Sequence, residues 1–313
     1  MNYVKNHVPV HEIPADLKQT FHHEFTHTTS KDILLKMKHE NKITDRDLKV
    51  VKFLHQFHFA TPQQIFDYIH DETDENETVG AVQARLDKLV HAHVLNKFCL
   101  SSIKENRVYQ DALTIYCLDF GGKYLLMNFS NEDLTQWFSS ENFKTSELIA
   151  KDLMVVDFYL KVYKQTEGKI TFFESSTTFQ FEKTTLCPSF HFGLTIDGTL
   201  RYFIGEVAKD EDVPLFFRKK VEKYNQFLTT NAWKKYFFES EPPILFVLTE
   251  TDQLAQLCGQ ILEQVSEIKR YRLTTQSRLE RPLTDLGAFL RYLPEEGKCQ
   301  EVRIPIFDKT KLK

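Results

Sequence analysis

The stretch that most constrains the fold of this chain is a predicted hairpin over residues 187–210. Two apolar runs meet there at Asp197-Gly198, a dipeptide that readily adopts the positive φ angles of a two-residue turn. Pro188 precedes the first run, and a glutamate, Glu206, lies near the end of the second. The stretch therefore predicts two antiparallel strands with an acidic side chain close to the end of the second strand.

The rest of the second half alternates strand patterns with helix patterns. Short apolar runs bounded by turn residues indicate strands, and apolar residues that recur with a period near 3.6 indicate helices. This alternation predicts a mixed α/β sheet covered by helices. The expected strands cover residues 170–175, 244–250, 271–275 and 301–307, and the expected helices cover 215–230 and 252–268.

Three consecutive helix signals characterise the first half. Residues 44–57 and residues 79–95 each place apolar side chains on one helical face. Between them, Thr61 is a predicted N-cap, with Pro62 at the first helical position and Gln64 completing a capping box. Two strand patterns joined by a polar loop follow these helices. Three helices and then a two-stranded wing is the order of a winged helix-turn-helix.

The length of 313 residues suits two domains, because single hydrophobic cores stop growing at roughly 250–300 residues. We therefore expect an α+β or α/β protein in which a winged helix-turn-helix domain precedes a mixed-sheet domain. The expected parts are a polar and helical N-terminal extension (1–43), the winged helix-turn-helix domain (44–130), a linker helix (145–165) and the α/β domain (166–313).

The composition limits the cellular compartment and the kinds of partner that we expect for this protein. Five scattered cysteines without a CxxC pair indicate a reducing compartment. No signal-peptide pattern or membrane-length apolar segment is visible, so we expect a cytoplasmic protein with no membrane partner. The formal net charge of −4 gives no global attraction to nucleic acid, so any DNA binding depends on a local basic face.

Several segments resemble the replication-relaxation family of Gram-positive plasmids and other mobile elements. The resemblance rests on AVQARLDKLVHAHVLNKF (81–98), on YCLDFGGKYLL (116–126) and on the strand–Glu–strand block with its KVEKYNQF helix (220–227). It implies a winged helix fused to a domain of the PD-(D/E)xK nuclease-like fold, in a family of which some members are thought to act as relaxases in conjugation. The implied partners are double-stranded DNA and relaxosome or replication proteins.

The winged helix predicts a set of DNA-binding residues. In this architecture the third helix enters the major groove, and the wing contacts the DNA backbone. Gln and Arg can pair with adenine and guanine edges, whereas Lys suits phosphates. The predicted residues are Gln83, Arg85, Lys88 and His91 on the third helix, with Lys97, Lys104 and Arg107 on the wing.

An acidic loop favours a different partner. Its carboxylates directly precede the third helix, where they stabilise the helix N-terminus but repel a phosphate backbone. The alternative is a winged helix that contacts protein, as a regulator or in a homodimer. The acidic residues are Asp71, Glu72, Asp74, Glu75 and Glu77.

The predicted hairpin follows the PD-(D/E)xK pattern but departs from it at two positions. Metal-dependent phosphodiester cleavage needs clustered carboxylates and a lysine. Pro188 and Glu206 match, but Ser189 stands at the aspartate position and Ala208 at the lysine position. Lys209 comes one residue late, and a shift of one residue turns a strand side chain to the opposite face.

Glu174, on the strand over residues 170–175, is a reserve carboxylate for this pattern. The candidate catalytic residues are therefore Glu206, Glu174 and Lys209, and Mg²⁺ or Mn²⁺ is the metal if the domain is a nuclease. Because one ligand is lost and the lysine is displaced, we expect a degenerate domain that holds DNA without catalysis or cofactor.

The most basic stretch covers residues 217–236. Its mixture of basic and aromatic residues suits a nucleic-acid strand. Oppositely charged residues four apart, such as Arg218 and Glu222, are equally typical of a solvated amphipathic helix. The predicted DNA-binding residues of this stretch are Lys219, Lys220 and Lys223.

A third chemical signal lies near the amino terminus. Residues His23 to His27 match H-E-x-x-H, a pattern that binds zinc when it lies on a helix. The residues that follow continue a helix poorly, and no third ligand has convincing spacing, so we expect surface histidines and no metal site.

Together these patterns predict a DNA-binding protein of a plasmid or other mobile element, acting in replication, in transfer within a relaxosome, or in their control. The first alternative is an active metal-dependent relaxase or nuclease, and the second is a protein-binding winged-helix regulator.

Overall fold

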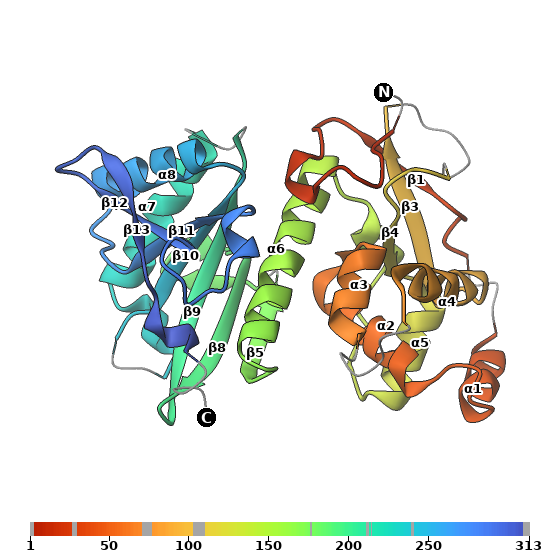
Figure 1. Cartoon of the computed structure of the whole chain (residues 1–313). Helices are drawn as coiled ribbons and strands as arrows, with labels where there is room; N and C mark the ends of the chain where they lie inside the picture. The colour runs from red at the N-terminus through yellow and green to blue at the C-terminus, as the bar shows by residue number, and fades with distance from the viewer. Residues whose placement is uncertain are drawn as a thin grey trace. The chain divides into compact units, whose positions relative to one another are not determined.

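The computed structural model describes residues 3–26, 30–70, 77–102, 110–175, 177–210, 213, 215–238 and 241–308. They form a mixed α+β protein that divides into two compact units, Met1–Val156 and Asp157–Lys313 (Figure 1). The division falls inside the long helix α6, Ser146–Gln165, which therefore contributes residues to both units.

Side-chain caps begin the three central helices of the first unit. The predicted capping box at Thr61 is confirmed, because the Thr61 hydroxyl accepts the Gln64 N–H at 3.2 Å and Gln64 Oε1 accepts the Thr61 N–H at 3.0 Å. Thr44 and Asp47 form a second capping box, and the Thr78 side chain caps α4. The helices are α1 (Lys31–His39), α2 (Asp45–Phe57), α3 (Pro62–Ile69), α4 (Val79–His91) and α5 (Phe120–Phe129), with short 3-10 helices at η1 (Val10–Glu12) and η2 (Ser139–Asn142).

An antiparallel four-stranded sheet with the order β1-β3-β4-β2 completes the first unit. The extension over residues 1–43, expected to be polar and helical, contributes both β1 and α1. Pairing with β1 satisfies the backbone groups that β3 would otherwise leave unpaired at the sheet edge. The strands are β1 (Lys18–Phe21), β2 (Phe59–Ala60), β3 (Leu95–Ser101) and β4 (Ile115–Leu118).

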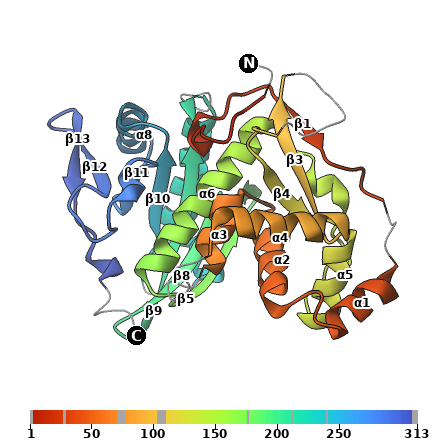
Figure 2. The same cartoon turned by 45° about the vertical axis from the view of Figure 1, so that its right-hand side comes forward.

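The second unit is built on a mixed seven-stranded sheet with the order β13-β12-β11-β10-β9-β8-β5. Strands β9, β10 and β11 run parallel, and the other neighbours pair antiparallel (Figures 1 and 2). The predicted hairpin is confirmed as β8 and β9, with Asp197 at φ 49° and Gly198 at φ 78°. The sheet strands are β5 (Ile170–Ser175), β8 (Phe190–Ile196), β9 (Thr199–Ala208), β10 (Ile244–Thr249), β11 (Tyr271–Thr275), β12 (Phe289–Leu293) and β13 (Lys298–Val302).

A second, two-stranded sheet lies between β5 and β8 in the chain, where no strands were predicted. It pairs β6 (Phe179–Phe181) with β7 (Thr184–Leu186). Phe179 and Phe181 are buried against Phe227 of helix α7 (Leu215–Thr229). The centroid of each of their rings lies 5.2 Å from the centroid of the Phe227 ring. These strands therefore extend the hydrophobic core rather than the main sheet.

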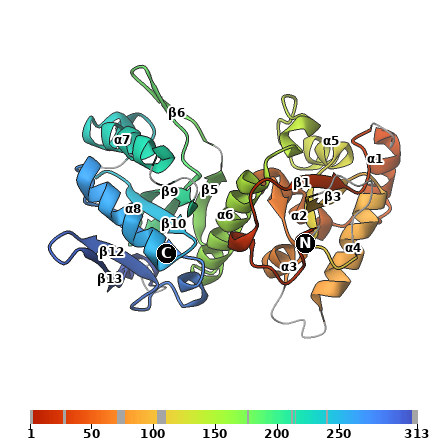
Figure 3. The same cartoon turned by 90° about the horizontal axis from the view of Figure 1, so that it is seen from above.

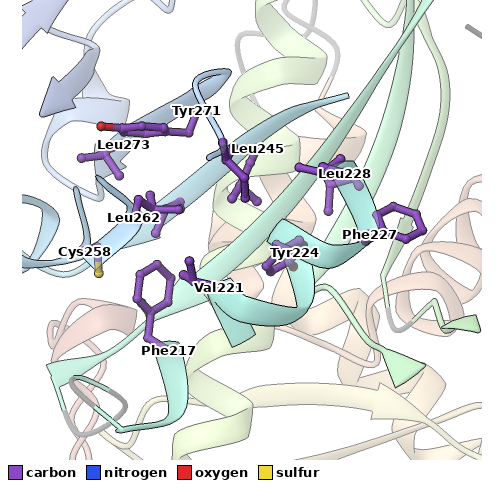
Figure 4. Packing of buried hydrophobic residues seen from close by; sticks show 14 of the residues in the cluster. Phe217, Val221, Tyr224, Phe227, Leu228, Leu245, Cys258, Leu262, Tyr271 and Leu273 are labelled. Carbon is purple, nitrogen blue, oxygen red and sulfur yellow. The ribbon is translucent and has the colours of Figure 1, made fainter. Parts of the chain in front are cut away.

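Helices α7 (Leu215–Thr229) and α8 (Asp252–Val265) cover one face of the large sheet (Figure 3). In Figure 4 the α7 side chains Val221 and Tyr224 face Leu245 of β10 and Leu262 of α8. The opposite face packs on α6, where the Phe158 ring lies 4.9 Å from that of Phe190 and 5.8 Å from that of Phe246. The remaining short helices are η4 (Ala232–Lys235), η5 (Arg278–Glu280) and η6 (Pro305–Phe307). Among the described residues, no helix combines the length and apolarity needed to cross a membrane.

The packing of Phe190 over Gly205 yields a stability prediction. A Cβ atom at position 205 would lie 1.9 Å from Phe190 Cζ, so Gly205→Ala must displace a fully buried ring. We expect the free energy of unfolding to fall by about 2 kcal/mol or more. The matched control is Gly80→Ala in α4, where the nearest atom to the new Cβ is 3.9 Å away. We expect this control to stabilise by about 0.5 kcal/mol, because Ala favours a helix over Gly. Urea unfolding measures whether the free energy of unfolding falls in Gly205→Ala and rises in Gly80→Ala. Equal changes in the two variants would contradict the packing of Phe190 over Gly205.

Candidate nucleic-acid interface and Glu206 site

Arg85 of α4 is directed at α2 rather than outward. Its Nε donates to Asp47 Oδ1 at 2.8 Å, its Nη2 donates to Asp47 Oδ2, and the same Nη2 donates to the Lys42 carbonyl at 2.7 Å. Burial alone raises the pKa of Asp47, but hydrogen bonds from Arg85 and Thr44 outweigh it and leave that pKa below its ordinary value. Arg85 was predicted to read DNA bases, and in the structure it forms a bidentate ion pair that ties α4 to α2 while its side chain stays 37% exposed.

Lys97 is likewise engaged inside the first unit. Its Nζ lies 2.8 Å from Asp87 Oδ1, and the Tyr116 hydroxyl donates to the same oxygen at 2.8 Å. Burial raises the pKa of Tyr116, so its hydroxyl remains a donor. Asp87 thus joins α4 to β3 and β4, and Lys97 serves this junction rather than extending from a wing. The other predicted wing residues, Lys104 and Arg107, lie outside the described residues.

The outward face of α4 is formed mainly by small residues. Gly80, Ala81 and Ala84 are exposed, and Lys88 and His91 continue the same face towards the helix end. His91 Nδ1 lies 2.6 Å from the carbonyl of residue 87, one turn earlier. Gln83 is half-buried beside this face. Of the predicted α4 residues, Lys88, His91 and Gln83 therefore remain accessible, whereas the Arg85 charge is neutralised.

The acidic segment that precedes α4 is described only at its last carboxylate. Glu77 forms an ion pair with Arg46, and it contacts His70 Nδ1 at 3.3 Å. The Arg46 hydrogen bond holds the pKa of Glu77 below its usual value. At this position the predicted repulsion of phosphate is offset by two neighbouring bases. Asp71, Glu72, Asp74 and Glu75 lie outside the described residues.

Glu206 is the centre of a buried polar cluster in the second unit. Alternate residues of β9 face α7, which places the Glu206 carboxylate, 4% exposed, beneath that helix. Lys220 Nζ lies 2.7 Å from Glu206 Oε1, and the Tyr224 hydroxyl donates to Oε2 at 2.8 Å. Ser189, opposite Glu206 on the neighbouring chain segment, donates its hydroxyl to Oε1 at 3.1 Å. Both carboxylate oxygens are therefore satisfied.

Tyr224 and Ser189 make this arrangement rigid. Complete burial, with the charge of Glu206 beside it, raises the pKa of Tyr224 well above its ordinary value, so the phenol stays protonated and donates. The Ser189 hydroxyl also accepts the Val207 N–H at 3.0 Å, and the Ser189 N–H donates to the Gly205 carbonyl at 3.0 Å. Ser189, which occupies the position of the missing aspartate, thus supplies neutral hydrogen bonds in place of a second negative charge.

The other two candidate catalytic residues make separate contacts. Lys209 lies one residue beyond Ala208, and its Nζ pairs with Glu250 Oε1 at 2.7 Å, as the one-residue shift led us to expect. Glu174 lies on β5, about 10 Å or two strand spacings from β9. It contacts His191 Nε2 at 3.6 Å and accepts from the Thr177 hydroxyl at 3.1 Å. Within the described residues, Glu206 belongs to no group of three metal-ligating side chains.

Lys220 has a role that the sequence did not reveal. It was predicted to bind DNA, and the structure pairs it with Glu206 beneath α7. The spacing of Lys220 and Tyr224, four residues apart on one helical face, is the signal that could have linked both to a common partner. Lys219 and Lys223 are exposed on the same helix, and Lys223 Nζ donates to the Thr185 carbonyl at 3.0 Å.

The H-E-x-x-H pattern does not lie on a helix. His23 follows β1, and residues 22–26 have no helical structure. Zinc binding by this pattern needs its two histidines one turn apart on a helix, and the described part of the pattern is not helical. His27 lies outside the described residues.

Comparison with protein families, with curated proteins and with solved structures finds no match for this chain. The proposed function therefore rests on the contacts within the chain itself.

The Glu206–Lys220 pair yields a double-mutant prediction. Glu206→Gln leaves the Lys220 charge under α7 without its partner, and Lys220→Met leaves a buried carboxylate without its cation. We expect each change to lower the free energy of unfolding by about 2–4 kcal/mol. The double variant should lose at least about 1 kcal/mol less than the sum of the two single losses. Urea unfolding provides the measurement. Lys219→Met, on the exposed side of α7, is the control and should change stability by less than about 0.5 kcal/mol. Strict additivity of the two single changes would show that the pair does not interact.

The Arg85–Asp47 pair predicts a pH-dependent effect. Because the folded pKa of Asp47 is depressed, the stability that it contributes is present above the ordinary carboxyl pKa and is lost as pH falls through the folded value. Arg85→Met should destabilise by about 2 kcal/mol at neutral pH, and the difference from the parent should shrink below about pH 4. Urea unfolding between neutral and acid pH, with Lys88→Met as the control, measures this difference. A difference that stays constant with pH would contradict the assigned ion pair.

Proposed function

We propose that this chain is a double-stranded DNA-binding protein whose first unit is a winged helix-turn-helix. The observation that carries the proposal is the order α2–β2–α3–α4–β3–β4, in which β4 pairs with both β3 and β2. This is the succession of helices and antiparallel strands that presents a third helix to the major groove. On this proposal α4 is the recognition helix.

The composition of the exposed face of α4 supports a close approach to DNA. Exposed Gly80, Ala81 and Ala84 keep the helix narrow, and the B-DNA major groove is about 12 Å wide. Lys88 offers a phosphate contact, and Gln83 offers the amide that pairs with adenine. Because Arg85 and Lys97 are neutralised internally, we assign DNA contact to Lys88, Gln83 and His91 and withdraw it from Arg85 and Lys97.

The second unit supports the proposal through its topology and its exposed charges. The order α6–β5–β8–β9–α7–β10, with β9 and β10 parallel, is the one expected of a PD-(D/E)xK-like core. Glu206 is the acidic residue of that pattern, and its charge is balanced by Lys220. We therefore propose that this unit holds DNA without cleaving it. The exposed bases on α7 and η4 are Arg218, Lys219, Lys223, Lys234 and Lys235.

The proposed setting is the one implied by the resemblance to the replication-relaxation family: replication, relaxosome-dependent transfer, or their control in a mobile element. An active nuclease is the second candidate, because Lys220 places a lysine beside Glu206 from another element than the expected strand. Cleavage by a hard divalent cation needs clustered carboxylates, and the Glu206 oxygens are already shared among Ser189, Lys220 and Tyr224. Because both Glu206 oxygens already have hydrogen-bond partners, DNA binding is favoured over DNA cleavage.

DNA binding is tested by fluorescence anisotropy on duplex DNA across a salt series. We expect Lys88→Ala to weaken binding several-fold and to reduce the slope of log K against log salt by about 0.9, because one phosphate contact is lost. Lys49→Ala, an exposed lysine of α2, makes the same charge change elsewhere and should leave the slope unchanged. Equal slopes for the parent and Lys88→Ala would remove α4 from the interface. Absence of any salt-dependent binding would favour the protein-binding regulator.

The nuclease candidate has its own assay. Supercoiled plasmid incubated with the parent protein and Mg²⁺ or Mn²⁺ should stay intact. Nicking that disappears in Glu206→Gln but persists in Lys183→Met, an exposed lysine between β6 and β7, would establish the nuclease in place of the non-catalytic role.

A further inference from the structure

Three side chains that could ligate a metal meet in the first unit. They are His23 after β1, His93 between α4 and β3, and Asp119 at the end of β4, and their ligand atoms all lie within 4.8 Å of one another. His23 Nε2 lies 2.8 Å from Asp119 Oδ2, and the two imidazole rings are 4.3 Å apart between centroids. The Asp119 side chain is fully buried, whereas the histidines are 19% and 25% exposed. The group thus combines a buried carboxylate with two imidazoles that solvent can reach.

Each of the three residues is held by neighbouring backbone. Asp119 caps α5, because its Oδ1 accepts the Phe120 N–H at 2.7 Å. The His93 carbonyl accepts the Gly121 N–H at 2.9 Å, and any Cβ at Gly121 would lie only 2.5 Å from that oxygen. The His23 carbonyl accepts from Asn96 Nδ2 at 2.9 Å. A ligand set positioned in this way is preorganised rather than carried on long free side chains.

One nitrogen of the group is not accounted for by hydrogen bonding. His93 Nδ1 is buried and has no hydrogen-bond partner among the described residues. It faces Asp119 Oδ2 at 3.6 Å, which is longer than a hydrogen bond. A buried imidazole nitrogen beside a carboxylate, and unsatisfied by any donor or acceptor, is the arrangement that a bound cation would complete.

We propose that His23, His93 and Asp119 form a site for a divalent transition metal of the zinc class. Zinc accepts His nitrogen at about 2.0–2.1 Å and carboxylate oxygen at about 2.0–2.2 Å, so its tetrahedral ligands lie about 3.3 Å from one another. The separations of 2.8 and 3.6 Å from Asp119 Oδ2 bracket this value. Two imidazoles select against magnesium and calcium, which prefer oxygen ligands. Water would complete the coordination, since the group supplies three protein ligands.

The site joins parts of the chain that are distant in sequence. His23 belongs to the N-terminal segment that adds β1 to the edge of the sheet, and His93 follows α4 directly. Metal binding would therefore fasten β1 to the α4–β3 turn and to the start of α5. This role is independent of whether α4 binds DNA, and it differs from the H-E-x-x-H pattern, which would pair His23 with His27.

The proposal is tested on the full-length protein after removal of metal with a chelator. Titration with Zn²⁺ by calorimetry should give one equivalent, and Co²⁺ should develop the visible absorption of a tetrahedral site. Zinc should also raise the Tm of the protein, because it binds only the folded chain. His23→Ala and His93→Asn should each weaken Zn²⁺ binding at least tenfold. Asparagine is chosen at position 93 because φ there is 54°, in the left-handed region that it tolerates.

His91→Ala is the matched control, since His91 is exposed, lies two residues from His93 and stands outside the ligand group. It should bind Zn²⁺ within twofold of the parent. The proposal is overturned if the parent shows no one-equivalent binding, or if His91→Ala weakens binding as much as His93→Asn. Circular dichroism establishes that each variant is folded. If His23→Ala is unfolded, then His93→Asn and Asp119→Asn decide, and parent-like zinc affinity in both would overturn the site.

Discussion

The buried Glu206 carboxylate is the constraint on which the second unit depends. A charge beneath α7 is tolerated only with a cation and hydrogen-bond donors beside it, and Lys220, Tyr224 and Ser189 supply them. Because two of these donors come from α7 and one precedes β8, the carboxylate fixes the helix on the β8–β9 pair. Tyr224 also packs in the apolar core between α7, β10 and α8, so the polar cluster and the core share one side chain.

In the first unit, too, charged side chains form ion pairs within the unit. Asp47 forms an ion pair with Arg85, and Asp87 forms one with Lys97. Both basic residues had been predicted from the sequence to bind DNA. These pairs fix α4 against α2 and against β3 and β4. They also reduce the basic surface that α4 presents to a partner, because Lys88 is the exposed lysine of this helix. The proposed DNA recognition by α4 would depend on shape and a few contacts more than on a strong positive field.

The contacts of Glu206 in the second unit support the proposal that this unit holds DNA without cleaving it. Serine at position 189 gives Glu206 a hydroxyl donor, where aspartate would have given a second carboxylate to share a divalent cation. Lys220 approaches Glu206 from a helix rather than from the strand, and it neutralises the acid instead of leaving it available. Glu206 therefore lies in a hydrogen-bonded cluster whose charges balance and which is suited to stability.

The sequence by itself determined the local features: the Thr61 capping box, the turn at Asp197-Gly198, and the separation of Lys209 from the Glu206 cluster, because these follow from spacing along one chain segment. Only the tertiary structure decided which charges meet. Ion pairs such as Arg85–Asp47 and Lys220–Glu206 join residues 38 and 14 positions apart, and no local periodicity encodes such contacts. The grouping of His23, His93 and Asp119 likewise required the pairing of β1 with β3, since three elements converge there only after the sheet has formed.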